Sequence, residues 1–197
     1  MTNILLIVSI ILTIGNYLYV LLLKQTSKKG KDKASQAVIE LTKDDNSIHL
    51  VENKDNYISK YLIKRKIIKL TTNTYNSNSI FSISIAYLFS GYTKLNNNKI
   101  NTIGKIIPYL YPISFTPLIA CLISLIIKTS MDAKIGLILL ILILIYQYII
   151  YDQNVEAVEN LKIKEKDILE SLNKIILISK LFFIITLIQI VRIIPII

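Results

Sequence analysis

Four long runs of apolar residues, separated by lysine-rich stretches, constrain the fold of this chain more than any other feature. The first run, residues 4–23, is twenty residues long and contains only four small or polar interruptions. A helix of this length reaches about 30 Å, the thickness of the hydrocarbon core of a bilayer. A cleaved signal peptide is the alternative, but no positive charge follows Met1 and no small-x-small cleavage site precedes Lys24. Residues 1–23 are therefore predicted to form a transmembrane anchor.

The second and third runs share a short connecting loop. Residues 106–127 contain three prolines, which membrane helices tolerate when neighbouring groups satisfy the freed carbonyls. Residues 135–151 form the shortest run, with seventeen residues, so this helix is expected to stand nearly upright in the bilayer. Both runs are predicted to span the membrane.

The fourth run, residues 175–197, contains two basic residues, Lys180 and Arg192. It crosses the bilayer if these long side chains snorkel toward opposite faces. A re-entrant or surface helix is the alternative. With this run, the chain is predicted to be an α+β membrane protein with about four transmembrane helices.

The distribution of lysine and arginine predicts the orientation. Residues 24–105 carry fifteen of them and residues 152–174 carry four, whereas the loop 128–134 carries two. By the positive-inside rule, both large polar segments lie in the cytoplasm of a multi-pass protein of the cell membrane, and both chain termini lie outside. The net charge of +10 is then matched by lipid headgroups, and we expect no nucleic-acid partner.

The basic segment 24–105 has the pattern of a small α+β domain. Apolar residues from Ala34 to Leu41 recur at helical spacing. A small antiparallel sheet is predicted from three short strands, at residues 47–52, 57–62 and 66–71.

A polar turn at residues 73–78 then leads into a helix at 79–92, which is apolar nearly all round. Ser77 or Asn78 is expected to cap this helix. Such a helix must be buried in the domain or pressed against the membrane. After the third span, a polar helix is expected to continue over residues 152–174.

The turn at residues 69–79 reads KLTTNTYNSNS and leads into the apolar helix. This turn and the order of the parts resemble the neutral zinc metallopeptidases of bacterial membranes, in which a Leu-Ser-x-x-Val-Tyr-x-x-x-Ser-like turn precedes a helix bearing HExxH. The residues that match are Leu70, Tyr75, Ser79, Ala86 and Gly91, with Gln189 and Arg192 in the last run. The resemblance implies a zincin-like cytoplasmic domain between the first and second spans.

The zinc chemistry of that family is missing at the matching positions. In HExxH, two histidines at i and i+4 bind one zinc ion, and the glutamate is the general base. The flanking matches place this motif at Leu88-Phe89-Ser90-Gly91-Tyr92. Leu88 cannot bind a metal, Phe89 cannot accept a proton, and Tyr92 is a poor ligand at a pKa of about 10. We therefore expect no catalytic site, no metal site and no cofactor at Leu88, Phe89 and Tyr92.

The family's third zinc ligand is a glutamate in a Glu-x-Asn-like context after the third span, which Asp152 matches through Asp152-Gln153-Asn154. Asp152 keeps a carboxylate and is expected to face the apolar helix. It shares a helical face with Glu156 and Glu159; together they could attract a cation, but we interpret them as a solvated acidic face beside the lysines of the loop. The single histidine, His49, is interpreted as a surface residue or one whose hydrogen bonds are satisfied, and the single cysteine, Cys121, lies inside an apolar run.

Three hypotheses follow from the sequence. The leading one is a catalytically inactive pseudopeptidase that binds polypeptides, or that scaffolds membrane or protein partners such as an active relative. The second is an active membrane zinc peptidase with an unusual site or one shared with a partner chain. The third is a structural membrane protein whose resemblance is only architectural. The missing ligands argue against a working enzyme.

Overall fold

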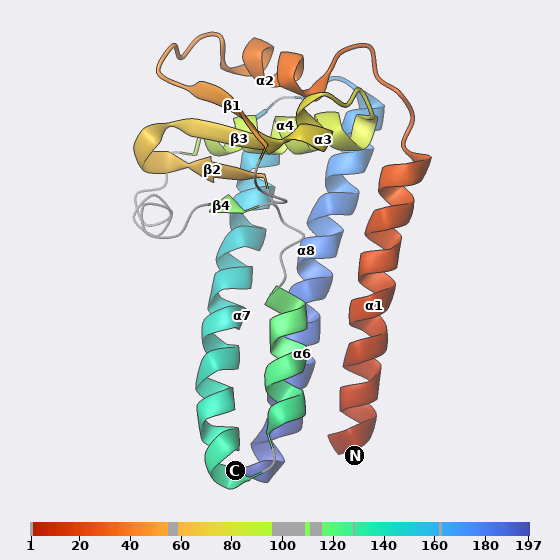
Figure 1. The fold of residues 1–197 in the computed structure, drawn as a ribbon, viewed down its shortest axis with the longest axis vertical. Coiled ribbons are helices and arrows are strands. Elements are labelled where there is room, and N and C mark those ends of the chain that lie inside the picture. The colour runs from red at the N-terminus through yellow and green to blue at the C-terminus, as the bar shows by residue number, and fades with distance from the viewer. Residues whose placement is uncertain (1, 55–58, 96–108, 111–115, 128, 162) are drawn as a thin grey trace. The chain divides into compact units, whose positions relative to one another are not determined.

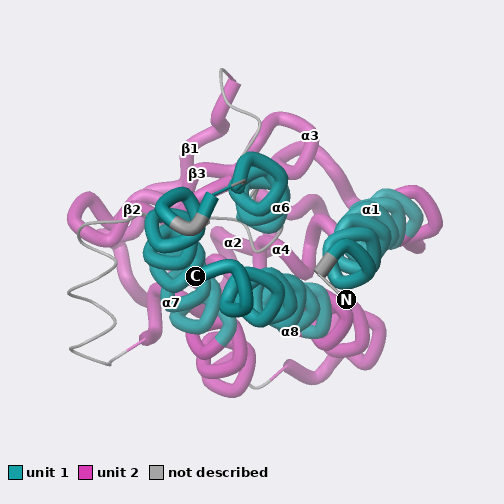
Figure 2. Tube along the Cα trace, turned by 90° about the horizontal axis from the view of Figure 1, so that it is seen from below, with its two compact units in different colours: residues 1–22, 113–151, 177–197 teal, residues 23–112, 152–176 magenta. Residues whose placement is uncertain are grey.

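The fold is taken from a computed structural model of the full chain. It describes residues 2–54, 59–95, 109–110, 116–127, 129–161 and 163–197. The chain divides into two compact units, coloured separately in Figure 2. Unit 1 comprises Met1–Leu22, Ile113–Tyr151 and Leu177–Ile197, and unit 2 comprises Leu23–Pro112 and Asp152–Ile176.

Unit 1 is built from apolar helices (Figure 1). Three helices are long and apolar enough to cross a membrane, namely α1 (Thr2–Thr26), α7 (Ser130–Glu159) and α8 (Lys166–Ile193). Each of them continues from unit 1 into unit 2. The fourth, α6 (Thr116–Ile126), has eleven residues and is about 16 Å long, roughly half the hydrocarbon thickness. The chain ends in a single 3-10 turn, η2 (Ile194–Ile196).

Unit 1 has apolar side chains on its outside as well as in its core, and it buries polar side chains between its helices. Large apolar side chains face outward, as with Ile4, Ile126 and Ile138, which are 66%, 70% and 61% exposed. The buried polar side chains are Ser9, Thr13, Asn16, Ser124, Gln147, Ser179, Thr186, Gln189 and Arg192. Apolar surface costs about 25 cal/mol per Å² in water but nothing comparable in lipid. The exterior of unit 1 is therefore compatible with a bilayer.

The second predicted span does not form as expected. The span was expected to begin with a bent entry at Pro108 and Pro112, and within this stretch Tyr109–Leu110 forms strand β4. Most of the remaining residues between 106 and 115 lie outside the described part of the chain. Of the four predicted runs, three belong to helices long enough to cross a membrane, and the second contributes only α6.

The polar helix predicted over residues 152–174 is interrupted. Helix α7 ends at Glu159 and α8 begins at Lys166. Asp167 lies in the first turn of α8, where a carboxylate interacts favourably with the exposed amide groups and with the helix dipole. The last apolar run therefore belongs to a helix that starts before residue 175.

Unit 2 contains a mixed sheet of order β1-β3-β2-β4. Its strands are β1 (His49–Asn53), β2 (Lys60–Leu62), β3 (Ile67–Thr71) and the two-residue β4. The prediction of an antiparallel sheet is wrong for β1, which pairs with β3 in parallel. The 3-10 turn η1 (Ile63–Arg65) and Lys66, at φ 49°, reverse the chain between the antiparallel strands β2 and β3. Strand β3 lies between β1 and β2 in the sheet, so β1 pairs with β3 and not with β2.

Helices α2 (Ala34–Thr42) and α4 (Ile80–Tyr92) pack against each other, and α4 also contacts β2 and β3. Both helices were predicted, and both are confirmed. The one-turn helix α3 (Thr72–Tyr75) precedes α4. The N-cap of α4 is Ser79, whose hydroxyl accepts from the Ser82 amide at 3.1 Å. The prediction of Ser77 or Asn78 as the cap is wrong, because Ser77 instead accepts from the Ser79 amide.

Helix α4 is the buried core of unit 2. Eleven of its thirteen residues are buried, as its uniformly apolar sequence predicts. Near its end, Gly91 packs on Ala157 of α7: a Cβ atom on Gly91 would lie 2.5 Å from the Ala157 carbonyl oxygen. Because that atom belongs to a helix backbone, it cannot move aside at low cost.

We expect Gly91→Ala to destabilise the protein by about 1–3 kcal/mol, because the overpacking outweighs the gain in helix propensity of about 1 kcal/mol. The unfolding midpoint in detergent should fall by about 2–4 °C for each kcal/mol. Gly15→Ala is the matched control, because a Cβ atom there would meet nothing within 4 Å. Equal midpoints for the two variants would contradict the close contact.

Candidate functional site

The positions that match the zinc motif form a packed contact within unit 2. Leu88 and Phe89 are completely buried. The rings of Phe89 and Tyr92 meet edge to face, with centroids 5.4 Å apart. The Tyr92 hydroxyl donates to Oδ1 of Asn154 on α7. These side chains therefore fill the space beside α4 and present no metal ligand of the usual kinds.

The three residues that match the family's Glu-x-Asn-like context are separated by the turn of α7. Asp152 is exposed, whereas Gln153 and Asn154 are completely buried. Successive residues of a helix point about 100° apart, so these three cannot share one face. The expectation that Asp152 faces α4 is wrong, since Asn154 is the residue that reaches it. The Gln153 amide has no hydrogen-bond partner within the described residues.

The residues of unit 2 do not fit the zinc ion that the resemblance implies. Among the described residues, no group of three or more His, Cys, Asp or Glu side chains is placed to hold a metal ion. Glu156 is half-buried and Glu159 is exposed on α7, and His49 is exposed on β1. Cys121 is buried in α6. No step of zinc chemistry can therefore be derived for this site.

Among the described residues in the polar part of unit 2, the carboxyl groups with a shifted pKa, Asp45 and Glu170, are both shifted downward. Burial raises the pKa of Tyr61 and of Tyr87 above the usual value, so both phenols stay protonated at neutral pH. The pKa of Asp45 is lowered, mainly by a hydrogen bond from the Ser47 hydroxyl. A catalytic base that works near neutrality would need a raised carboxyl pKa instead.

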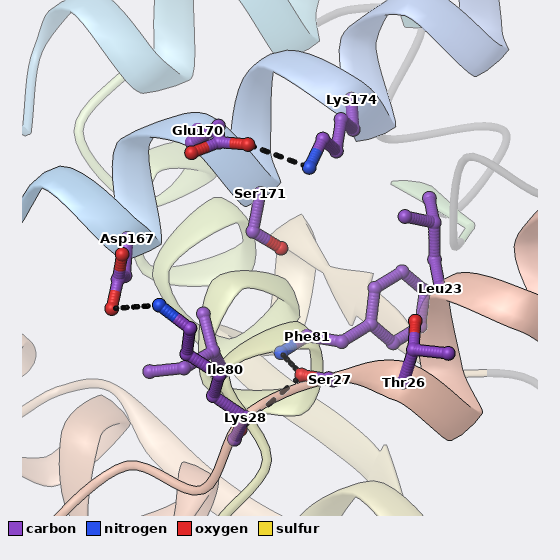
Figure 3. A pocket seen from close by; sticks show the side chains of 10 residues that line it. All are labelled: Leu23, Thr26, Ser27, Lys28, Ile80, Phe81, Asp167, Glu170, Ser171 and Lys174. Carbon is purple, nitrogen blue, oxygen red and sulfur yellow. Dashed lines mark hydrogen bonds and ion pairs between the residues drawn. The ribbon is translucent and has the colours of Figure 1, made fainter.

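A pocket of about 180 Å³ lies where the last turn of α1, the start of α4 and the first turns of α8 meet (Figure 3). All its residues belong to unit 2. Two ion pairs line it. Lys28 lies 3.6 Å from Asp167, and Lys174 donates to Glu170 at 2.7 Å. The Ser171 side chain points from α8 toward the space between these pairs (Figure 3).

The chain that follows α1 completes the N-terminus of α4 and so holds the pocket together. The first amides of a helix have no partner inside it. Here the Ile80 amide donates to the Lys28 carbonyl and the Phe81 amide to the Ser27 hydroxyl, both at 2.8 Å. The Gly30 amide donates in turn to the Asn78 carbonyl at 2.6 Å.

Unit 1 contains a cluster of buried polar side chains that links three helices. The Gln189 amide of α8 donates to the Ser9 hydroxyl of α1, and it lies 3.6 Å from the Cys121 sulfur of α6. The Thr13 hydroxyl lies 3.5 Å from the same sulfur. Polar groups between apolar helices typically hold them together, and we assign this role to the cluster.

Arg192 belongs to the same interior. It was predicted to snorkel outward, but it is 7% exposed and donates from Nη1 to the Ser124 carbonyl oxygen at 2.7 Å. Lys180, by contrast, is exposed. The expectation of two snorkelling residues is therefore wrong for Arg192, because its guanidinium donates a hydrogen bond to a carbonyl oxygen of α6 inside unit 1.

Comparisons with protein-family models, with curated proteins and with solved structures find no match for this chain. The resemblance to membrane zinc peptidases therefore remains a prediction.

Sequence reasoning missed the pocket, because its residues come from three parts of the chain that share no motif. It also chose Asp152, and not Gln153 or Asn154, as the residue that faces α4. One available signal was the pair Gln153-Asn154, which continues the buried stripe of α7 one turn before Ala157.

We expect Tyr92→Phe to destabilise the protein by about 1–3 kcal/mol, because it removes the donor to a buried Asn154 oxygen. Tyr87→Phe on the same helix is the control. Tyr87 is half-buried, and its hydroxyl makes no hydrogen bond within the described residues. Its removal should change stability by less than about 0.5 kcal/mol. Thermal unfolding of both variants in one detergent tests the contact, and equal shifts would argue against it.

Proposed function

We propose that this chain is an integral membrane pseudopeptidase, a non-catalytic protein that binds or scaffolds membrane or protein partners through its polar unit. The supporting observation is the packing of α4: the positions of the expected zinc motif are filled by buried apolar side chains and by the contact of Gly91 with Ala157. Binding without cleavage needs neither a metal ion nor a general base. It is therefore the function that these residues support best.

Membrane embedding is supported by the exterior of unit 1. Its outward-facing side chains are largely isoleucine and leucine, and polar side chains such as Ser9, Gln189 and Arg192 lie inside, where they make hydrogen bonds between helices. We further propose that the polar segments 24–105 and 152–174 lie in the cytoplasm, because they carry nineteen of the 23 lysines and arginines.

Cysteine labelling tests this topology. In a Cys121→Ser background, single variants Lys64→Cys, Asn160→Cys and Met131→Cys each place a thiol at an exposed position. A membrane-impermeant maleimide added to intact cells should label residue 131 only. All three variants should react after the membrane is permeabilised. If residues 64 and 131 react alike in intact cells, the proposed orientation is wrong.

Metal analysis tests the absence of catalysis. The purified natural protein should contain well below one zinc per chain and should not cleave unstructured peptides, because a catalytic zinc site usually needs about three protein ligands. Stoichiometric zinc would overturn the proposal and favour an active peptidase with a shared or unusual site. Cleavage that survives chelation would also overturn it.

A restored motif provides the positive control for that measurement. The triple variant Leu88→His, Phe89→Glu and Tyr92→His is made alone, with Asp152 as the third ligand that the resemblance implies, and again with Asn154→Asp. We expect zinc in the second version, since residue 154 reaches residue 92 and Asp152 is exposed. Bound zinc should also raise the unfolding temperature. Zinc in neither version would contradict the placement of the motif on α4.

A further inference from the structure

We propose that the pocket lined by α1, α4 and α8 binds the headgroup of a phospholipid that carries both a phosphate and a primary ammonium group. This inference rests on the proposed membrane embedding and not on the proposed absence of catalysis. The two can therefore fail separately.

The charges of the pocket match such a headgroup. Its two lysines and two carboxylates, Lys28 with Asp167 and Lys174 with Glu170, balance (Figure 3). A zwitterion can exchange partners with both pairs, its phosphate going to the lysines and its ammonium to the carboxylates. An anionic headgroup has no group for the two carboxylates and would be repelled by them.

The exchange of partners costs little, because both ion pairs are solvated. The side chains of Lys28 and Asp167 are 78% and 54% exposed, and those of Lys174 and Glu170 are 39% and 60% exposed. Ion pairs of this kind contribute little to stability. Charge-assisted hydrogen bonds from a primary ammonium group to Asp167 or Glu170 can therefore replace them.

The size and position of the pocket favour a lipid as the source of this headgroup. Its volume of about 180 Å³ is below the roughly 300–1,000 Å³ of pockets for drug-sized ligands, so it suits one small polar group. Leu23 and Phe81 provide an apolar wall beside the charges. Leu23 ends the apolar run of α1, and Lys174 precedes that of α8, so the pocket borders two helices long enough to cross a membrane. Phospholipid headgroups lie where the apolar run of a membrane-crossing helix ends.

Lipid retention by the full-length protein tests the assignment. The protein is reconstituted in nanodiscs with equal amounts of phosphatidylethanolamine, phosphatidylcholine and phosphatidylglycerol, and retained lipids are counted by native mass spectrometry. Phosphatidylethanolamine should be enriched about tenfold over phosphatidylcholine, whose quaternary ammonium has no N–H to donate. The double variant Asp167→Asn, Glu170→Gln should lose this preference. Enrichment of phosphatidylglycerol instead, or no enrichment, overturns the proposal.

Asp45→Asn is the matched control, because Asp45 is also an exposed carboxylate 3.6 Å from a lysine, Lys66, but lies outside the pocket. It should keep the full preference, and an equal loss in this control overturns the assignment to the pocket. Unfolding midpoints confirm that the variants are folded. If the double variant does not fold, the single variant Asp167→Asn or Glu170→Gln is used in its place. Free phosphoethanolamine is titrated in parallel. Binding of this soluble compound without enrichment of the lipid overturns the lipid as its source.

Discussion

The outward-facing apolar side chains of unit 1 leave its buried polar groups to find hydrogen-bond partners among the helices. Lipid offers no hydrogen bonds, so an unpaired polar group there costs several kcal/mol. The Gln189 side-chain nitrogen finds partners on α1 and α6, and Nη1 of Arg192 finds one in the Ser124 carbonyl oxygen of α6. The Gln189 side-chain oxygen and Nε of Arg192 have none among the described residues. Helix α6 is held by these polar contacts and by an apolar cluster that includes Ala120 of α6, Leu140 of α7 and Ile193 of α8.

In unit 2 the corresponding constraint is the close approach of α4 to α7. A zinc peptidase needs a helix with an open side, where two imidazoles and a carboxylate surround an ion and a water molecule. In this chain the same side is occupied by the Phe89 and Tyr92 rings and by the contact of Gly91 with Ala157. Close packing of this kind stabilises a buried helix, but it leaves no space for a substrate. The close packing that stabilises α4 and the open space that hydrolysis would need at α4 therefore exclude each other.

Much of the fold could be predicted from the sequence, since long apolar runs and helical spacing are local signals. Helices α2 and α4 and three of the apolar runs follow from such patterns. The parallel pairing of β1 could not, because it depends on which distant strand lies beside β1 in the sheet. The site was harder to predict. Which of Asp152, Gln153 and Asn154 faces α4 depends on the rotation of α7, and the pocket exists only once three distant segments meet.

The long sequence separation of the contacts around α4 has a consequence for synthesis. Its N-terminus is completed by residues 27–30, which leave the ribosome earlier. Gly91, near the end of α4, packs on Ala157, and the Ser84 hydroxyl donates to the Ile168 carbonyl at 3.4 Å. Ile168 follows Tyr92 by 76 residues, so at about 5–20 residues per second it is made roughly 4–15 s later. During that interval the nascent chain carries an apolar helix without its cover, and shelter by the translocation machinery or a chaperone would then decide the yield of folded protein.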